Sequence, residues 1–241
     1  MRSLTTKNRD ASELHGLRQP GRAPTLALRS VDRCVVDSLT LTSNIELDRA
    51  RFLELERAAS RPYGEFVYGG DALHAAVHEY LLDGNAAEFS PPQGKLAVVD
   101  GEPVGMCAWL SCSLLRQRRA QAAYRLSRSR FIASDADLRR RIRLAAGTLV
   151  RPVDNDLYLS RLAIEPAARG CGFANAILAQ LLREARAAGA ARCVLEVAPT
   201  NTAAIALYGR HGFVPIDERS VTDGRTGRVL SYLHMVCTLD S

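Results

Sequence analysis

Long apolar runs are absent from this sequence of 241 residues: no run of about 18 apolar residues occurs, so no membrane-spanning helix is expected. The first residues, MRSLTTKNRDASELHG, lack the apolar stretch of a signal peptide, so we expect a cytoplasmic protein. The six cysteines form no CxxC pair and no zinc-finger spacing with histidine, which favours buried reduced thiols and no metal.

Lysine is scarce as well, because only Lys7 and Lys95 occur among 32 basic residues and the other 30 are arginines. The formal net charge of +6 fits a polyphosphate cofactor, an acidic partner protein or nucleic acid, and does not choose among them. Ten arginines lie between positions 116 and 143, with only Asp135 and Asp137 as acids. We expect one or two basic helices inserted at about 113–150, with either a solvated face or a docking surface for an acidic partner.

The order of elements predicts one folded domain. Residues 1–24 are polar and predict a disordered tail, which leaves residues 25–241 for the domain. A capping box at Ser43 and Glu46 predicts a helix, and RPYGEFVYGG predicts a loop. We expect strands within 25–36, 95–112 (a hairpin turning at Asp100-Gly101), 157–164, 192–198, 213–221 and 229–239, and helices over 46–59, 71–83, 173–188 and 201–211. This order implies an α/β fold, a mixed sheet with helices on its faces.

The segment EPAARGCGFA carries the chemistry. Arg169, Gly170, Gly172 and Ala174 stand where a strand turns into a helix, whose unpaired N–H groups and positive dipole suit a phosphate. Arg169 adds charge and donors. The spacing is neither GxGxxG nor GxxxxGK[ST], which argues against dinucleotide and P-loop sites. A tight strand-to-helix turn without a ligand is the alternative.

These residues resemble the cofactor loop of the GCN5-related N-acetyltransferases (GNAT), Arg/Gln-x-x-Gly-x-Gly/Ala. The resemblance continues through LSRLAIEP before the loop and LEVAPTNTAAIALYGRHGF after it. Within it, 196–213 is most similar to the ribosomal-protein N-terminal acetyltransferases. The resemblance implies a GNAT fold: a mostly antiparallel mixed sheet, helices on both faces, and a V-shaped splay between two central parallel strands.

The resemblance also implies acetyl-CoA as co-substrate. Backbone groups of Leu162, Ala163 and Ile164 would pair with the pantetheine arm. Asn201 would cap the next helix and contact the cofactor. The pyrophosphate would lie on the amides of the loop, which comprises Arg169, Gly170, Cys171, Gly172, Phe173 and Ala174.

Two catalytic residues follow from the same resemblance. Tyr208 matches the family's tyrosine acid and Glu196 the glutamate base of the ribosomal-protein enzymes. A packed core tyrosine and an ion-paired glutamate are the alternatives. Asp156, Tyr158 and Glu165 are spare base candidates.

Other side chains are weaker candidates for metal binding, catalysis or acceptor binding. His74 and His78 are i,i+4 neighbours without HExxH, and we expect them on a helix surface rather than on zinc. A nucleophilic role for Cys171 is not favoured, because the family uses this position for its backbone. The acceptor is expected at the aromatic, acidic loop, where a loop merely packed on the sheet is the alternative; its residues are Tyr63, Glu65, Phe66 and Tyr68.

The sequence therefore predicts an acyltransferase that moves acetyl from acetyl-CoA to a primary amine by direct attack in a ternary complex. The acceptor, a small molecule or a peptide or protein, is left open. Alternatives are an enzyme that takes longer acyl groups from acyl-CoA or from an acyl carrier protein, and a non-catalytic acyl-CoA binding module. Nucleic-acid binding lacks an aromatic and basic recognition motif, and no membrane partner is expected.

Overall fold

One seven-stranded sheet organises residues 36–133 and 135–239, the part of the chain that the computed structural model describes. Its strands, in spatial order, are β1 (Thr40–Thr42), β2 (Gly94–Val99), β3 (Glu102–Ser111), β4 (Asp156–Ile164), β5 (Arg192–Val197), β7 (Val229–Thr238) and β6 (Val214–Thr222). Within this sheet β4 and β5 pair in parallel, and the other neighbours pair antiparallel. The mixed, mostly antiparallel sheet expected from the sequence is thus confirmed.

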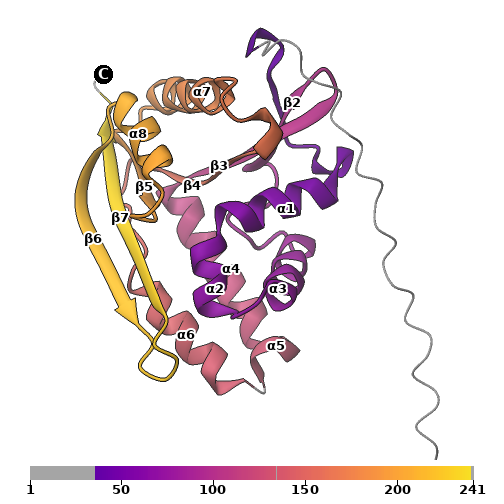
Figure 1. The fold of residues 1–241 in the computed structure, drawn as a ribbon, viewed down its shortest axis with the longest axis vertical. Coiled ribbons are helices and arrows are strands. Elements are labelled where there is room, and N and C mark those ends of the chain that lie inside the picture. The colour runs from indigo at the N-terminus through magenta and orange to yellow at the C-terminus, as the bar shows by residue number, and fades with distance from the viewer. Residues whose placement is uncertain (1–35, 134, 240–241) are drawn as a thin grey trace, which may run out of the picture. The chain divides into compact units, whose positions relative to one another are not determined.

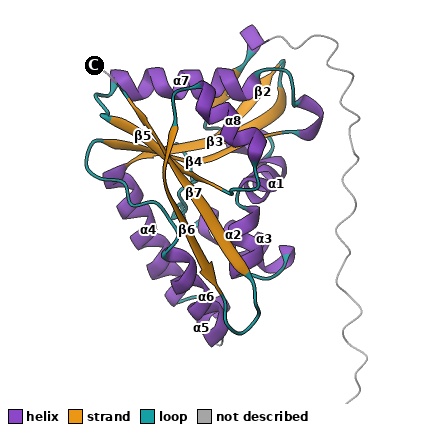
Figure 2. Ribbon diagram, turned by 60° about the vertical axis from the view of Figure 1, so that its left-hand side comes forward, coloured by secondary structure: helices purple, strands orange, loops and turns teal. Residues whose placement is uncertain are grey.

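Helices cover both faces of the sheet (Figures 1 and 2). One face carries α7 (Phe173–Ala187) and α8 (Thr202–Arg210). The other carries α1 (Arg49–Ala59), α2 (Arg61–Val67), α3 (Asp71–Asp83), α4 (Cys112–Ser127), α5 (Arg130–Ala133) and α6 (Ala136–Ala146). Because side chains alternate along a strand, β3 sends Met106 and Ala108 to one core, and Cys107 and Trp109 to the other. None of the described helices is long and apolar enough to span a membrane.

The N-terminal part differs from the sequence prediction. The strand expected at 25–36 and the tail at 1–24 lie outside the described residues, apart from Val36, which begins a short 3-10 turn. The capping box at Ser43 and Glu46 does not start the first helix. Instead α1 begins at Arg49, because the carboxylate of Asp48 accepts the N–H of Arg51. Glu46 lies in a 3-10 turn, Ile45–Leu47.

The predicted loop at 61–70 is wrong for most of its length, since residues 61–67 form α2. Pro62 stands in the first turn of that helix, where its missing N–H costs nothing. The turn residues Tyr68, Gly69 and Gly70 follow it, and α3 then spans the predicted 71–83. A helix rather than a loop therefore faces the expected acceptor side.

The arginine-rich insertion between β3 and β4 is helical, as predicted, but comprises three helices rather than one or two: α4, α5 and α6. Its charge is largely turned inward. Arg119 pairs with Glu88, and Arg140 makes two hydrogen bonds, of 2.7 and 2.9 Å, to the buried Asp223. Arg141 donates to the carbonyl of Val67. A purely solvated basic face is therefore not what these helices present.

Candidate active site

The two central parallel strands separate after a short contact. β4 and β5 pair only at Asp156–Tyr158 against Arg192–Val194. Beyond that point β4 continues along β3 as far as Ile164, and β5 continues along β7 as far as Val197. The edge of β4 that turns toward β5 is thus unpaired at Leu162, Ala163 and Ile164, and it offers backbone donors and acceptors to an extended ligand.

A glycine loop joins the open end of β4 to α7. Gly170 and Gly172 have φ of +84° and +85°, a region that favours glycine, and Gly172 is the N-cap of α7. A Cβ atom at Gly170 would meet nothing within 4 Å, so the loop is open to the outside. Arg169 is exposed and its Nε donates to the carbonyl of Ile164 at 3.3 Å, which ties the loop to the end of β4.

The amides of this loop are unsatisfied. The N–H groups of Gly170, Gly172, Phe173 and Ala174 make no hydrogen bond within the described residues. They lie at the start of a 15-residue helix, where the dipole favours an anion. Cys171 is disulfide-bonded, so the expectation of reduced thiols is wrong there, whereas Cys107, Cys112 and Cys193 are free thiols. The loop fits a pyrophosphate through its backbone.

Asn201 and Tyr208 come from the next helix. The Asn201 side chain accepts the N–H of Ala204 at 3.2 Å, as expected of the N-cap of α8. Tyr208 is buried on the α7–α8 face against Phe213, with ring centroids 5.7 Å apart. Its hydroxyl makes no hydrogen bond within the described residues, and burial raises its pKa above the ordinary value. Such a phenol stays protonated and can donate a proton.

Glu196 lies on β5 beside the splay and faces away from Tyr208. Cys193, Leu195 and Val197 pack on the α7–α8 face, so the alternation of the strand directs Glu196 to the opposite face. Its Oε1 accepts a 2.6 Å hydrogen bond from the hydroxyl of Tyr158, while its Oε2 is enclosed and has no partner in the described part of the chain.

Burial sets the proton affinity of this carboxyl. Removal from water raises the pKa of Glu196 to about 7, against the opposing effects of the Tyr158 hydrogen bond and of Arg119. A carboxyl that titrates near neutral pH and has one oxygen unpartnered can accept a proton.

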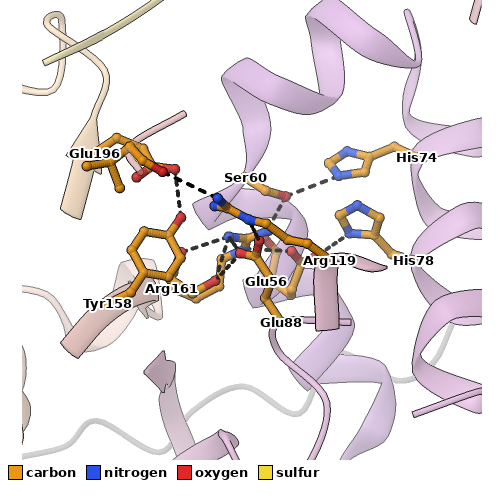
Figure 3. A network of polar contacts seen from close by, with 11 residues as sticks. Glu56, Ser60, His74, His78, Glu88, Arg119, Tyr158, Arg161 and Glu196 are labelled. Atoms are coloured by element: carbon orange, nitrogen blue, oxygen red, sulfur yellow. Dashed lines mark hydrogen bonds and ion pairs between the residues drawn. The ribbon is translucent and has the colours of Figure 1, made fainter. Parts of the chain in front are cut away.

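Glu196 lies at one edge of a buried polar network (Figure 3). Arg161 of β4 pairs with Glu56 of α1 at 2.8 Å, and Glu88 accepts bonds from Arg119 at 2.7 Å and Ser160 at 2.9 Å. Arg119 also lies 5.3 Å over the ring of Tyr158. Sequence reasoning missed Arg119, Glu88 and Glu56, because their partners are far away in the chain.

His74 and His78 are buried, so their expected place on a helix surface is wrong. They face α1, where His78 Nδ1 bonds Glu56 and His74 Nε2 lies 3.1 Å from Ser60 Oγ. Burial would raise the pKa of Glu56, but His78 and Arg161 lower it to about 2. Burial also lowers the pKa of His74 to about 4, so this ring is neutral at pH 7. The ligating atoms of Glu56, His74 and His78 lie within 4.8 Å of one another, but each already has a protein partner.

The spare base candidates have structural partners. Asp156 is buried and makes two 2.9 Å hydrogen bonds with Arg192. Glu165 is buried and pairs with Arg51 at 3.3 Å. Tyr158 is the exception, because its partner is Glu196 itself.

A groove of about 630 Å³ opens beside the end of β5. Glu65 and Phe66 of α2 line it, together with residues 198–200 after β5 and residues of the β6–β7 hairpin, including Glu218 and Arg228. Of the aromatic, acidic residues expected at the acceptor, Tyr68 is buried and Tyr63 packs at the edge of the core. The groove is large enough for a small-molecule or peptide segment.

Comparisons with known proteins agree with this geometry. A family model described as the acetyltransferase (GNAT) family matches residues 54–213. No curated protein matches the sequence.

Three solved structures are among those that resemble this chain. An N-acetyltransferase from Staphylococcus aureus Mu50 is 16% identical, with a TM-score of 0.59 over 82% of this chain and 99% of that one. A structure described only as an acetyltransferase is 15% identical, with a TM-score of 0.52 over 84% and 99%. The ribosomal-protein-S18-alanine N-acetyltransferase from Escherichia coli is 16% identical, with a TM-score of 0.48 over 84% and 94%. The first two likenesses show the fold.

Proposed function

Since the chain belongs to the acetyltransferase (GNAT) family, we propose that it transfers an acetyl group from acetyl-CoA to a primary amine, in a ternary complex and without a metal. The observation that carries this proposal is the splay of β4 from β5, with an unsatisfied glycine loop at the open end of β4. A ligand with a pyrophosphate at the loop and an extended arm along Leu162–Ile164 would deliver its far end to the splay.

Acetyl-CoA would supply an activated acetyl thioester. The amides of Gly170, Gly172 and Ala174 would bind its pyrophosphate, and Arg169 would add charge. The side-chain amide of Asn201 stands at the start of α8 for a contact with the arm. Unpaired N–H groups on the β4 edge can polarise the thioester carbonyl.

Two residues would handle the protons. Glu196 would accept a proton from the attacking amine, directly or through a water, because its Oε2 is unpartnered and its pKa is about 7. Tyr208 would donate a proton to the departing thiolate from the other face of the sheet. The amine would enter through the groove, whose two carboxylates, Glu65 and Glu218, outnumber its one cation, Arg228, and so favour a cationic acceptor.

The test replaces Gly172 with glutamate. A side chain at a φ of +85° is strained, and its carboxylate would repel the pyrophosphate. Calorimetry should show at least a tenfold loss of acetyl-CoA affinity, while Gly224→Glu, at an open turn with nothing within 4 Å of its Cβ, should bind as wild type does. Normal binding by Gly172→Glu would refute the cradle. CoA release is then measured with a panel of amines and with acetyl-CoA or longer acyl-CoA donors. Amine-dependent release from acetyl-CoA supports acetyl transfer, release from the longer donors supports transfer of longer acyl groups, and no release with any pair supports acyl-CoA binding alone.

A further inference from the structure

The arginine-rich insertion encloses Glu196. The carbonyl of Thr148 bonds His234 at 2.7 Å, and His234 is the cross-strand partner of Glu196 on β7. Val150 packs in one buried cluster with Tyr158 and Val194, the neighbours of Glu196 in the sheet. The end of the insertion therefore covers the face of β5 to which Glu196 points.

The insertion also places the guanidinium of Arg119 on this side of the sheet, near Glu196. Arg119 of α4 donates to Glu88 through Nε at 2.7 Å and to the carbonyl of Val150 through Nη1 at 3.3 Å. These contacts fix the guanidinium over the ring of Tyr158, whose hydroxyl binds Glu196. In Figure 3 the guanidinium of Arg119 and the carboxylate of Glu196 point toward each other.

The side chains of Arg119 and Glu196 each have one polar atom without a hydrogen-bond partner. In the described part of the chain, four enclosed side-chain nitrogen or oxygen atoms lack a hydrogen-bond partner, and Arg119 Nη2 and Glu196 Oε2 are two of them. Arg119 Nη2 is a donor and Glu196 Oε2 is an acceptor. The charge of Arg119 stabilises the ionised Glu196, and the charge of Glu196 stabilises the protonated Arg119. Leaving such atoms unpaired is costly, so a function that uses them is favoured.

We propose that Arg119 is a positioning residue for Glu196: from the insertion its guanidinium lies over Tyr158, whose hydroxyl binds the Glu196 carboxylate, and its charge favours the ionised form that accepts a proton. The inference rests on the proposed function, since it gives Glu196 the role of base. It assigns the insertion a place in the active site rather than only on the surface.

Other charged or titratable groups face Glu196, and their effects differ in sign. The hydrogen bond of Tyr158 and the charges of Arg119 and Arg161 lower the pKa of Glu196, whereas the charge of Glu88 raises it. Tyr232 and His234 face it from β7, and His234 is occupied by Thr148. Removing Arg119 and removing Glu88 should thus move the proton affinity of Glu196 in opposite directions, which a merely structural role would not do.

The test measures the titration of Glu196 by ¹³C NMR of glutamate-labelled protein, with Glu196→Gln to assign the resonance. We expect the midpoint to rise by about one pH unit in Arg119→Gln, to fall in Glu88→Gln, and to stay close to wild type in Arg119→Lys. Arg116→Gln is the matched control, because Arg116 lies on the same helix, exposed, and pairs with Asp154. Circular dichroism checks that each variant is folded.

The pH dependence of kcat/KM, measured on the same variants, should shift in parallel. An unchanged midpoint in folded Arg119→Gln, or shifts of the same sign in Arg119→Gln and Glu88→Gln, would overturn the role of Arg119. A third outcome separates the two proposals: the NMR midpoint shifts as expected, but the pH profile of kcat/KM does not, and Glu196→Gln is fully active. This result would support the action of Arg119 on Glu196 and would refute the role of Glu196 as the base.

Discussion

Replacing Tyr158 with phenylalanine isolates the hydrogen bond on the proposed base. The side chain is buried and the ring would remain under Arg119, so mainly the 2.6 Å bond to Glu196 is lost. A hydrogen bond to a charged group contributes about 1.5–3 kcal/mol, and one pKa unit corresponds to about 1.4 kcal/mol. Because this bond stabilises the ionised carboxylate, its loss should raise the pKa of Glu196 by about one to two units from about 7.

The assay is the pH profile of kcat/KM, which reports the free enzyme. At pH 7 the ionised fraction of Glu196 should fall from about one half to a tenth or less, so kcat/KM should drop about 5- to 50-fold and recover toward pH 9 or above. Tyr124→Phe is the control, since Tyr124 is exposed on α4. An acidic limb at the wild-type position in Tyr158→Phe would refute the assignment of that limb to Glu196.

Three further expectations follow from the same geometry. Tyr208→Phe should lower turnover by about 10²-fold with little change in acetyl-CoA affinity, and unaltered turnover where chemistry limits the rate would dismiss Tyr208 as the acid. Glu196→Gln should be more stable than wild type at pH 8 but not at pH 4. The Glu196 carboxyl has a pKa of 4.5 in the unfolded chain and about 7 in the folded protein, so the stability of the wild type falls as pH rises between these values. Thermal melts of both proteins test this, and an equal difference in stability at the two pH values would contradict it. Arg128, Arg130 and Arg143 are exposed and make no ion pair within the described residues, so an acidic partner of the insertion would meet them first. Their glutamine triple variant should lose turnover of the true substrate at low salt while acetyl-CoA binding persists. Equal activity at every salt concentration would leave these arginines as solvated charges.

The geometry at the proposed cofactor site could be predicted from the sequence because its signals are local. Gly170 and Gly172 stand close together in the chain, and they adopt the positive φ that the pattern requires. Asn201 caps α8 through its own neighbour, Ala204. Hydrophobic periodicity likewise predicted α7 and β5, since their inward faces follow the 3.6 and 2 residue periods.

The polar network beside Glu196 could not be predicted, because its contacts are distant in the chain. The pairs Glu56–Arg161 and Glu88–Arg119 join residues 105 and 31 positions apart. Nothing in a single sequence distinguishes Arg119 from the exposed Arg116 three residues earlier. The burial of His74 was missed for the same reason, since its i,i+4 spacing with His78 describes one helix face but not whether α1 covers it.

The inward arginines also explain why so basic an insertion is tolerated. The last carbonyls of a helix have no partner within the helix and carry negative partial charge. Arg141 donates to Val67, the last residue of α2, and Arg125 to Tyr80 in the last turn of α3. Arg118 likewise donates to Asn85 just after α3. A guanidinium can serve two such acceptors at once through its planar fork, as a lysine ammonium on a single flexible stem cannot. The insertion therefore uses its positive charge at and just beyond the ends of α2 and α3, and Arg119 of the same insertion donates to the carboxylate of Glu88.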